Sequence, residues 1–545
     1  MRLLNFNSTN KTRNILLIVL AIYFLLGILT LNDYGYTWDD PQEFAYAQAN
    51  LRYLSGVDDS VKSHMAGYLF SPSNAGNLVG VLTKILFTDW LEILPADAGF
   101  HFSGVIFASL TLLLIILFSI KYIGNKAAII ATSLFIAFPR IFGHMHNNVK
   151  DITVMFAYML VIYCAYSLYK ERNNKWLIGF FASLAFAFNT KVLTLFLGII
   201  LVAWIIYLYK SGKLEINFFK KNNLNKKENK VKKKKNKSQT QEKILITKNG
   251  IIKAILIFII IMLVLNPVYW VNPGNLFKTF FMLNQVSSDA SQSLGDYPVM
   301  IYGELYTQTD RPIYYVPLMF GIVIPVITLL LFFAGLYYLY KREETELSWL
   351  LLLWLIIPSI IFSLPGISIY NIIRHILFLI PAIIIIASIG GLELIERQKN
   401  KIIKYVIIGI IGIGVLIPLC NIAIYHPYQT TYFNEIMGGI DGAEGKFEIE
   451  YWGNSYKEGT SWLNQNVENG SIVVVPIISE IPARYLRKDI TVKNNIGNDQ
   501  EFYYMFMRDK VEYNNEMTMF EISKIPEFEI IVKNTAILYI YKVTQ

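Results

Sequence analysis

The chain has 545 residues, of which 54% are hydrophobic and 16% are charged. A soluble protein of this length carries more charge and has amphipathic segments in place of long apolar ones, so the composition excludes that class. The formal net charge of +9 is accompanied by basic clusters between the apolar segments, which is typical of a polytopic membrane protein. Both cysteines, Cys164 and Cys420, fall inside apolar segments, so we expect no structural disulfide.

Apolar runs of about 18 residues or more are long enough to cross a bilayer core. We therefore expect a mainly α-helical membrane protein with about eleven transmembrane helices. The predicted spans are 14–31, 102–120, 127–142, 152–169, 176–190, 193–209, 251–269, 313–339, 349–364, 375–393 and 402–424. No small-residue cleavage site follows the first span, so we interpret it as a retained anchor and not as a signal peptide.

Basic clusters occupy alternate connections between the predicted spans. They run from Arg2 to Arg13, Lys121 to Lys126, Lys170 to Lys175 and Lys210 to Lys248, and then comprise Lys341 with Arg342 and Arg397 to Lys404. The positive-inside rule places all of these connections, and the N-terminus, in the cytoplasm. We expect the segment 32–101 and everything after about residue 425 on the extracytoplasmic side of the cell membrane.

The connection 210–250 is lysine-rich, with KKNNLNKKENKVKKKKNK at its centre. Its low complexity predicts a disordered cytoplasmic loop that helps to fix the topology, and contact with anionic lipid headgroups is compatible with that interpretation. A loop tethered at the membrane without interleaved aromatic residues is a poor nucleic-acid ligand, so we expect no nucleic-acid partner.

The first outer segment, 32–101, contains the sequence TWDDPQEF near its start. It predicts a helix that Asp40 caps, with Pro41 in the first helical position and Glu43 in the first turn. The apolar residues that follow recur at helical spacing, which predicts an amphipathic helix able to lie on a membrane surface. The two acids Asp39 and Asp40 either serve this helix start alone or belong to a site.

The pattern changes after about residue 450, where the sequence predicts a small extracytoplasmic α/β domain. We divide the chain into a transmembrane domain, 1–425, and this second domain, 426–545. The predicted elements are a helix at 456–467, strands at 471–477 and 502–507, and a β-hairpin at 527–543.

Ionisable side chains gather at the outer ends of the predicted spans, where burial is costly and a functional site is the default expectation. Beyond Asp39, Asp40 and Glu43, they are Arg140, His144, His146, Lys150 and Asp151 in PRIFGHMHNNVKD, Lys191 after the fifth span, and Arg374 with His375 at the tenth. Singly, Lys191 could snorkel, Arg374 could anchor a helix end, and the histidines could be loop residues. Their convergence on one face predicts a single site.

Carboxylates beside cations at a membrane interface suit transfer from a lipid-linked phosphate. The cations can hold the phosphate and stabilise the charge that develops on it, while a carboxylate accepts the proton of an attacking hydroxyl. We expect no cofactor. The spacing of His144 and His146 is weak evidence for a metal site, so none is assigned, although a divalent ion stays open.

Through TWDDP in the first outer loop and PRIFGHMHNNVKD in the second, the chain resembles integral-membrane glycosyltransferases with the GT-C fold. Within that fold it resembles the bacterial branch akin to protein O-mannosyltransferases, glycosyltransferase family 39. The resemblance covers roughly residues 1–425. It implies an inverting glycosyltransferase that moves a sugar from a polyprenyl-phosphate donor to a hydroxyl of a protein or glycan outside the membrane.

The resemblance also implies roles for individual residues. Asp39 takes the place of the catalytic acid of the pair, Asp40 stands where glutamate is usual, and Asp151 matches the acid of the second outer loop. Lys191 and Arg374 match basic positions that contact the donor phosphate. The remaining candidates for substrate binding are Glu43, Arg140, His144, His146, Lys150 and His375. The segment 426–453 also resembles a family sequence, and it suggests an ordered loop near the site without an assigned role.

Two other functions stay open. The acceptor could be a lipid, as for the aminoarabinose transferases that modify lipid A. The protein could instead be a secondary transporter, but a transporter places charges near the middle of broken helices and commonly contains repeats, whereas these charges lie at span ends. Neither the sugar nor the polyprenyl length can be read from the sequence.

Overall fold

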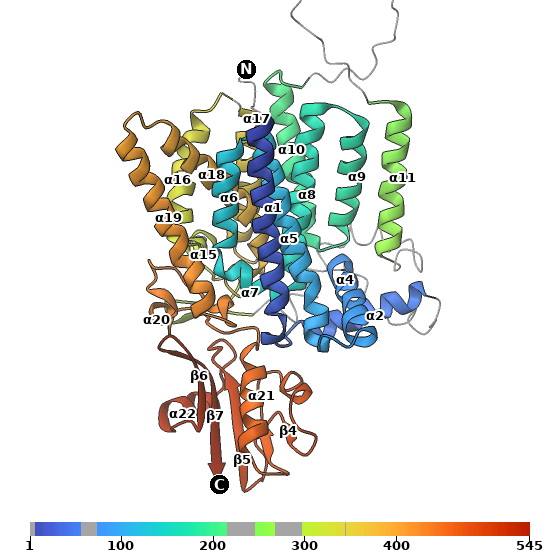
Figure 1. Cartoon of the computed structure of the whole chain (residues 1–545). Helices are drawn as coiled ribbons and strands as arrows, with labels where there is room; N and C mark the ends of the chain where they lie inside the picture. The colour runs from blue at the N-terminus through green and yellow to red at the C-terminus, as the bar shows by residue number, and fades with distance from the viewer. Residues whose placement is uncertain (1–5, 56–73, 215–245, 267–296, 344, 545) are drawn as a thin grey trace, which may run out of the picture.

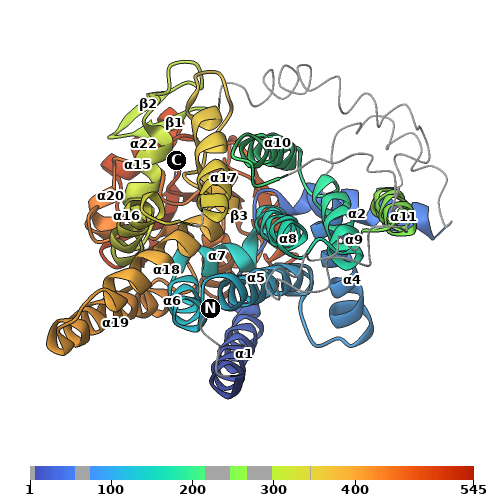
Figure 2. The ribbon, with the colours of Figure 1, turned by 90° about the horizontal axis from the view of Figure 1, so that it is seen from above.

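The computed structural model describes residues 6–55, 74–214, 246–266, 297–343 and 345–544. Long helices form a bundle with the N-terminus at one end, and a small sheet domain that carries the C-terminus lies at the other end (Figure 1). Seen along the bundle in Figure 2, α19 (Lys401–Ile424) and α11 (Lys248–Leu265) lie at opposite edges. The centre of the predicted lysine-rich loop lies outside the described residues.

Seven of the described helical segments are long and apolar enough to cross a membrane. They are α1 (Phe6–Leu29), α5 (Ala96–Tyr122), α8 (Val149–Glu171), α11, α17 (Thr345–Ser363), the 3-10 turn Arg374–Leu379 together with α18 (Ile380–Glu396), and α19. An eighth span results if α6 (Asn125–Ile136) and α7 (Pro139–Asn147), bent by 62° at a short break, count as one. The prediction of a multi-pass helical membrane protein is confirmed.

The count of eleven spans is reached only with three shorter apolar helices, α9 (Asn174–Phe188), α10 (Leu195–Lys210) and α16 (Val326–Tyr340). At about 1.5 Å per residue they fall short of a hydrocarbon core of about 30 Å. The sixth predicted span starts with a 3-10 turn, Val192–Thr194, and the eighth is divided into α15 (Tyr315–Val323) and α16. The last residues of the seventh, 267–269, lie outside the described part. Hydropathy therefore locates the apolar segments but overestimates how many are full-length spans.

The amphipathic helix predicted after the acidic pair is α2 (Asp40–Leu54), at the end of the bundle that faces the sheet domain (Figure 1). Its buried Ala47 clusters with Val81, Phe100 and Val149, from α4 (Asn74–Lys84), α5 and α8. The apolar periodicity is thus explained by packing on other helices of the protein. That packing holds the start of α2 close to the start of α8.

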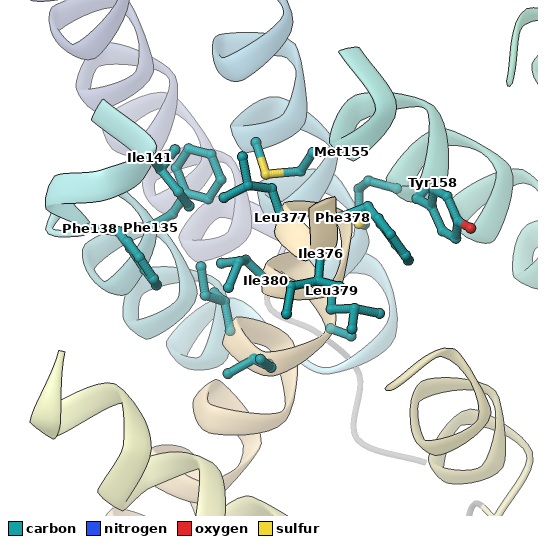
Figure 3. Packing of buried hydrophobic residues seen from close by; sticks show 14 of the residues in the cluster. Phe135, Phe138, Ile141, Met155, Tyr158, Ile376, Leu377, Phe378, Leu379 and Ile380 are labelled. Carbon is teal, nitrogen blue, oxygen red and sulfur yellow. The ribbon is translucent and has the colours of Figure 1, made fainter. Parts of the chain in front are cut away.

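A tightly packed core fixes the turn that begins at Arg374 (Figure 3). Phe378 of this turn stacks on Tyr158 of α8, with ring centroids 4.2 Å apart. The same core contains Met155 from α8 and Phe135, Phe138 and Ile141 from α6, α7 and the break between them. Because such a core tolerates little displacement, α7, α8 and the turn are held in a fixed arrangement.

The sheet domain is a five-stranded sheet with strand order β4-β3-β5-β7-β6. Its strands are β3 (Ile472–Val474), β4 (Thr491–Lys493), β5 (Glu501–Met507), β6 (Phe528–Val532) and β7 (Thr535–Thr544), with helices α21 (Ser455–Asn466) and α22 (Asn515–Ser523). β3 pairs in parallel with β4 and β5, whereas β7 pairs antiparallel with β5 and β6. The predicted helix, both single strands and the hairpin are all present. A hairpin of β1 (Val299–Ile301) and β2 (Glu304–Tyr306) was not expected.

Polar contacts join the sheet domain to the segment 32–101. Lys457 donates to the carbonyls of Asn32 and Tyr34, both at 2.8 Å, and to Asp97 at 3.0 Å. The hydroxyl of Tyr485 also donates to Asp97, at 2.7 Å. These contacts hold the domain against the end of the helical bundle.

The segment 426–453 contributes to both cores. Phe433 and Trp452 belong to the helical core, whereas Tyr428 and Ile449 belong to the core of the sheet domain. The boundary at residue 426 therefore follows the end of α19 at Ile424, but it does not separate two independent cores.

Candidate active site

The acidic pair lies at the start of α2. The helix begins at Asp40, one residue earlier than predicted. Asp39 therefore takes the N-cap position, and Pro41 is the second helical residue instead of the first. The expected cap by Asp40 is absent, because its side chain accepts a hydrogen bond from Thr37 instead. The side chain of Asp39, at the N-cap position, makes no cap hydrogen bond either. The backbone N–H of Trp38 donates to the carbonyl of Trp452 at 3.0 Å, which ties this turn to the segment before the sheet domain.

Asp40 is enclosed by the protein. One carboxylate oxygen accepts hydrogen bonds from the backbone N–H of Thr37 at 2.6 Å and from its hydroxyl at 2.8 Å. The Nε2 atom of His101, on α5, lies 2.9 Å from the same oxygen. The Asp40 side chain is only 4% exposed. The Asp40 side chain therefore joins the turn at Thr37 to His101 of α5.

Asp39 is the most accessible acid of the site, with a side chain that is 22% exposed. The ammonium of Lys150 lies 3.3 Å from its carboxylate, and the guanidinium of Arg374 contacts the same oxygen. Lys150 also pairs with Glu43, one turn further along α2. Burial raises the pKa of the Glu43 carboxyl, and the charge of Lys150 opposes that rise.

Asp151 forms the second acidic centre, near the start of α8. Its carboxylate accepts from Asn148 Nδ2 at 3.1 Å and pairs with Lys191 Nζ at 2.5 Å and Arg374 Nε at 3.3 Å. Burial lowers the pKa of the Lys191 ammonium, and the nearby Asp151 carboxylate opposes that shift. Arg374 touches both Asp39 and Asp151, so it links the two acidic centres into one cluster.

Two aromatic rings pack against the guanidinium of Arg374. Its guanidinium lies 4.3 Å from the ring centroid of Trp452 and 5.8 Å from that of Tyr370. A planar guanidinium stacks well on aromatic faces and keeps its N–H groups free in the plane. Trp452 thus positions the cation and, through its carbonyl, the residue before Asp39.

The structure brings six of the predicted site residues together. They are Asp39, Glu43, Asp151, Lys150, Lys191 and Arg374. Three acids and three cations balance in charge, and Lys150 and Lys191 keep partly exposed side chains. An incoming phosphate can therefore exchange for a carboxylate partner of these cations without entering an unpaired charged site.

Two other predicted residues lie outside the cluster. His146 stacks on Tyr34 at 4.1 Å, and its ring nitrogens lie 2.7 Å from the carbonyl of Phe142 and 3.0 Å from that of Gly27, so it joins α7 to α1. Arg140 is buried and donates to the carbonyl of Tyr432 at 2.7 Å. Both hold the fold together, and neither contacts the six charged residues.

His144 and His375 do not pair with the six charged residues but contact residues that do touch them. His144 Nδ1 is 3.3 Å from Asn148 Nδ2, the amide that donates to Asp151, and its ring meets the edge of Trp452 at 6.2 Å. His375 packs against Tyr370 with ring centroids 4.5 Å apart. Among residues 6–55, 74–214, 246–266, 297–343 and 345–544, no three His, Cys, Asp or Glu side chains are arranged to hold a metal ion.

Sequence reasoning missed Thr37, His101 and Asn148, and it gave Trp452 no role. A threonine three residues before an acid is a signal for Thr37, and the asparagine before VKD is an N-cap signal for Asn148. Trp452 lies in the segment 426–453, for which order near the site was expected without a role. His101 stands at the start of an apolar run and shows no local pattern.

Comparison with known proteins adds two findings. Residues 97–218 match the family model of dolichyl-phosphate-mannose-protein mannosyltransferases, whereas no curated protein matches the chain. Among solved structures, the chain resembles ArnT from Cupriavidus metallidurans bound to undecaprenyl phosphate, with a TM-score of 0.51 and 11% identity over 96% of this chain and 97% of that one. It also resembles the Archaeoglobus fulgidus oligosaccharyltransferase tethered with an acceptor peptide, with a TM-score of only 0.45 and 11% identity over 88% of this chain and 63% of that one.

The similarity to ArnT extends over nearly all of both chains, so it includes the sheet domain as well as the helices. At 11% identity it establishes the fold and not the chemistry. The family match spans α5 to α10 and includes Lys150, Asp151 and Lys191. The resemblance predicted from the sequence is confirmed: the chain has the GT-C fold of integral-membrane glycosyltransferases, and residues 97–218 match the mannosyltransferase family model.

Proposed function

We propose that the protein is an inverting glycosyltransferase that moves a sugar from a polyprenyl-phosphate donor to a hydroxyl of a protein or glycan. The observation that carries the proposal is one accessible carboxylate, Asp39, which contacts the cations Lys150 and Arg374, while Lys191 pairs with Asp151 in the same cluster. The mannosyltransferase match at residues 97–218 and the undecaprenyl phosphate bound by the similar ArnT support a lipid-linked donor.

Asp39 is the general base in this proposal. Asp40 is occupied by Thr37 and His101, and Asp151 is buried under Lys191 and Arg374. An acceptor hydroxyl attacks poorly unless its proton is removed as the new bond forms, and a positioned carboxylate contributes about 10² to 10⁴ in rate. Asp39 is the acid that an acceptor can reach.

The cations act on the other side of the reaction. The acceptor oxygen bonds to the anomeric carbon while the bond from that carbon to the phosphate oxygen breaks, and the electron pair leaves with the phosphate. The donor phosphodiester, with charge −1, becomes a polyprenyl phosphate with charge approaching −2, and Asp39 takes up the acceptor proton. Lys191 and Arg374 stabilise that added charge, which is the kind of interaction that lowers a barrier.

The contact between Arg374 and Asp39 has a consequence for substrate entry. In an inverting reaction the base and the leaving phosphate lie on opposite faces of the sugar ring. The sugar can lie between Asp39 and Arg374 only after their contact opens. Donor binding therefore replaces Asp39 with phosphate as a partner of Arg374, which frees the carboxylate for the acceptor.

The proposal includes an orientation. The basic connections point to a cytoplasmic N-terminus, so the cluster and the sheet domain would lie outside the cytoplasmic membrane. A donor presented on that face explains why the sequence contains no nucleotide-binding motif. Labelling of cysteines introduced at positions 60 and 235 of the full chain tests this orientation, and labelling of both from one side contradicts it.

The test of function is incubation of the purified chain with polyprenyl-phosphate sugars labelled in the sugar. We expect polyprenyl phosphate to be released in step with label entering protein or glycan, with inverted configuration at the anomeric carbon. Label in a lipid fraction supports the alternative lipid acceptor. Donor that stays intact, or a product with retained configuration, contradicts the proposal.

A further inference from the structure

A cleft of about 520 Å³ lies beside the acidic pair, between the start of α2 and the sheet domain. It is lined by Trp38, Pro41 and Gln42 on one side and by Pro476, Ile478, Ser479, Glu480 and Asn494 on the other. Its volume lies within the range of roughly 300 to 1,000 Å³ that is usual for small-ligand sites. Trp38, which lines one wall of the cleft, directly precedes Asp39 in the chain.

The chemistry of the lining suits a neutral saccharide. Trp38 is 37% exposed, and an indole ring is an apolar surface on which the C–H face of a sugar ring can pack. Gln42, Ser479 and Asn494 can each donate and accept hydrogen bonds, and Glu480 accepts them, so hydroxyl groups find partners of both kinds. None of the eight described lining residues is a lysine or an arginine, the side chains that recognise phosphate.

Both walls are held in place by contacts outside the cleft. The backbone N–H groups of Tyr36 and Trp38 donate to the Tyr485 hydroxyl at 2.7 Å and to the Trp452 carbonyl at 3.0 Å. On the opposite wall, the carbonyl of Ile477 accepts from the hydroxyl of Tyr456 at 2.7 Å. The two walls come from distant parts of the chain and meet in a fixed arrangement, as a binding site requires.

We propose that this cleft binds the saccharide portion of the acceptor and presents one of its hydroxyls to Asp39. The inference rests on the proposed function and narrows its acceptor to a glycan. The sheet domain then takes part in acceptor selection, because five of the eight lining residues belong to it. A peptide acceptor would need little of the stacking surface of Trp38 and is a separate outcome of the test.

The first test compares two neighbouring asparagines of the full chain. Asn494 lines the cleft, whereas Asn495 is exposed and lies outside its lining. With a neutral mannose or N-acetylglucosamine tetrasaccharide as acceptor, we expect Asn494→Ala to raise the acceptor KM about fivefold, as loss of one hydrogen bond does. Asn495→Ala should match the wild type, and the donor KM should change in neither variant.

A second pair tests the aromatic wall. Trp38→Ala should raise the acceptor KM about tenfold and Trp38→Phe should recover part of it, because a smaller ring still stacks. Trp90, which is 76% exposed in the same outer segment and outside the lining, is the matched control as Trp90→Ala. Hydrolysis of the donor by water reports whether Trp38→Ala has also disturbed Asp39.

Direct binding separates failure of this inference from failure of the proposed function. Saturation-transfer NMR with the same tetrasaccharides should detect binding to the wild type, weakened in Asn494→Ala and Trp38→Ala. If the donor is never consumed, the proposed function fails while this measurement still judges the cleft. Absence of saccharide binding, an unchanged acceptor KM in both cleft variants, or variants that affect only a serine- and threonine-rich peptide acceptor would overturn the inference.

Discussion

Asp39 and Asp40 are adjacent in the chain and lie in opposite environments. On the open side, Asp39 faces Lys150 and Arg374 and remains 22% exposed. On the closed side, Asp40 accepts three hydrogen-bonding contacts from Thr37 and His101 and is almost fully buried. The difference separates a group that can exchange partners from a group that holds the turn in shape.

The helix start explains how neighbours come to differ so much. Asp40 is the first residue of α2, and its side chain turns back toward Thr37 and α5. Asp39 precedes the helix and points toward α8 and the turn at Arg374. An acidic pair can therefore supply one reactive carboxylate and one structural carboxylate when a helix begins between them.

The largest expected effect concerns the open side. Asp39→Asn keeps the shape of the side chain and removes its basicity, so turnover should fall by about 10² to 10⁴. Donor binding should not weaken, because the cations remain and the carboxylate that competes with phosphate for Arg374 has lost its charge. Turnover and donor affinity of the purified variant check this, and a near-normal turnover would move the base to Asp151 or Glu43.

The next effect concerns the cations of the open side. Arg374→Ala should lower turnover by about 10², since it removes a donor aimed at the developing phosphate charge. Lys191→Met should act in the same direction, with a weaker apparent affinity for the donor. The exposed Arg397, paired with Glu393 at the other end of the bundle, is the control as Arg397→Ala. If Arg374→Ala behaves like this control, Arg374 is only an anchor.

A smaller effect, on stability, is expected from the closed side. Asp40→Ala leaves the buried N–H of Thr37 and the ring of His101 without a partner, which should lower the free energy of unfolding by about 1–3 kcal/mol. Asp40→Asn keeps an acceptor oxygen and should cost less. Thermal unfolding in detergent measures both, with the exposed Asp89→Ala as reference. Equal stability of Asp40→Ala and the reference would refute a structural role.

A pH-dependent effect on stability is expected at Glu450, whose side chain holds the turn at Trp452 and Gly453. Trp452 packs against Arg374, and its carbonyl accepts from the N–H of Trp38. The carboxylate of Glu450 accepts from the N–H groups of Trp452 and Gly453, and burial raises its pKa to about 7. Between about pH 4.5 and 7 the native carboxyl keeps a proton that the unfolded chain has lost. Its contribution to stability therefore falls as pH rises, by up to about 1.4 kcal/mol per pH unit.

Glu450→Gln lacks this titration and can still accept both hydrogen bonds. Its stability relative to the wild type should increase from pH 5 to pH 8, and then stay constant. Thermal unfolding across that range measures the difference, with the exposed Glu468→Gln as control. A difference that does not change with pH would mean that Glu450 titrates normally.

Local patterns in the sequence predict the elements whose signals are local. The helix after the acidic pair, the helix 456–467 and the hairpin 527–543 all appear close to their predicted positions, because the periodicity of apolar residues lies within each segment. The spans around α9, α10 and α16 are less well predicted, because hydropathy does not report where a helix stops. How the tail packs on the helices also has no local signal.

For the site, topology predicts which span ends meet but not which side chains touch. Lys150, Asp151, Lys191 and Arg374 converge with Asp39 as expected, since all lie at the same end of the bundle. His146 was placed with them by its loop, yet it faces α1, because a helix distributes its side chains around its axis. Trp452 reaches Arg374 only through the return of the chain after the last span.

The most direct test of the account is the ratio of turnover between Asp40→Asn and Asp39→Asn, each measured per folded molecule with a saturating polyprenyl-phosphate sugar. Because turnover is divided by the amount of folded protein, any loss of stability in Asp40→Asn does not enter the ratio, which then reports the rate of the reaction alone. The division into a reactive and a structural carboxylate predicts that Asp40→Asn turns over at least about 10² times faster. A ratio near one, or a slower Asp40→Asn enzyme, would contradict it.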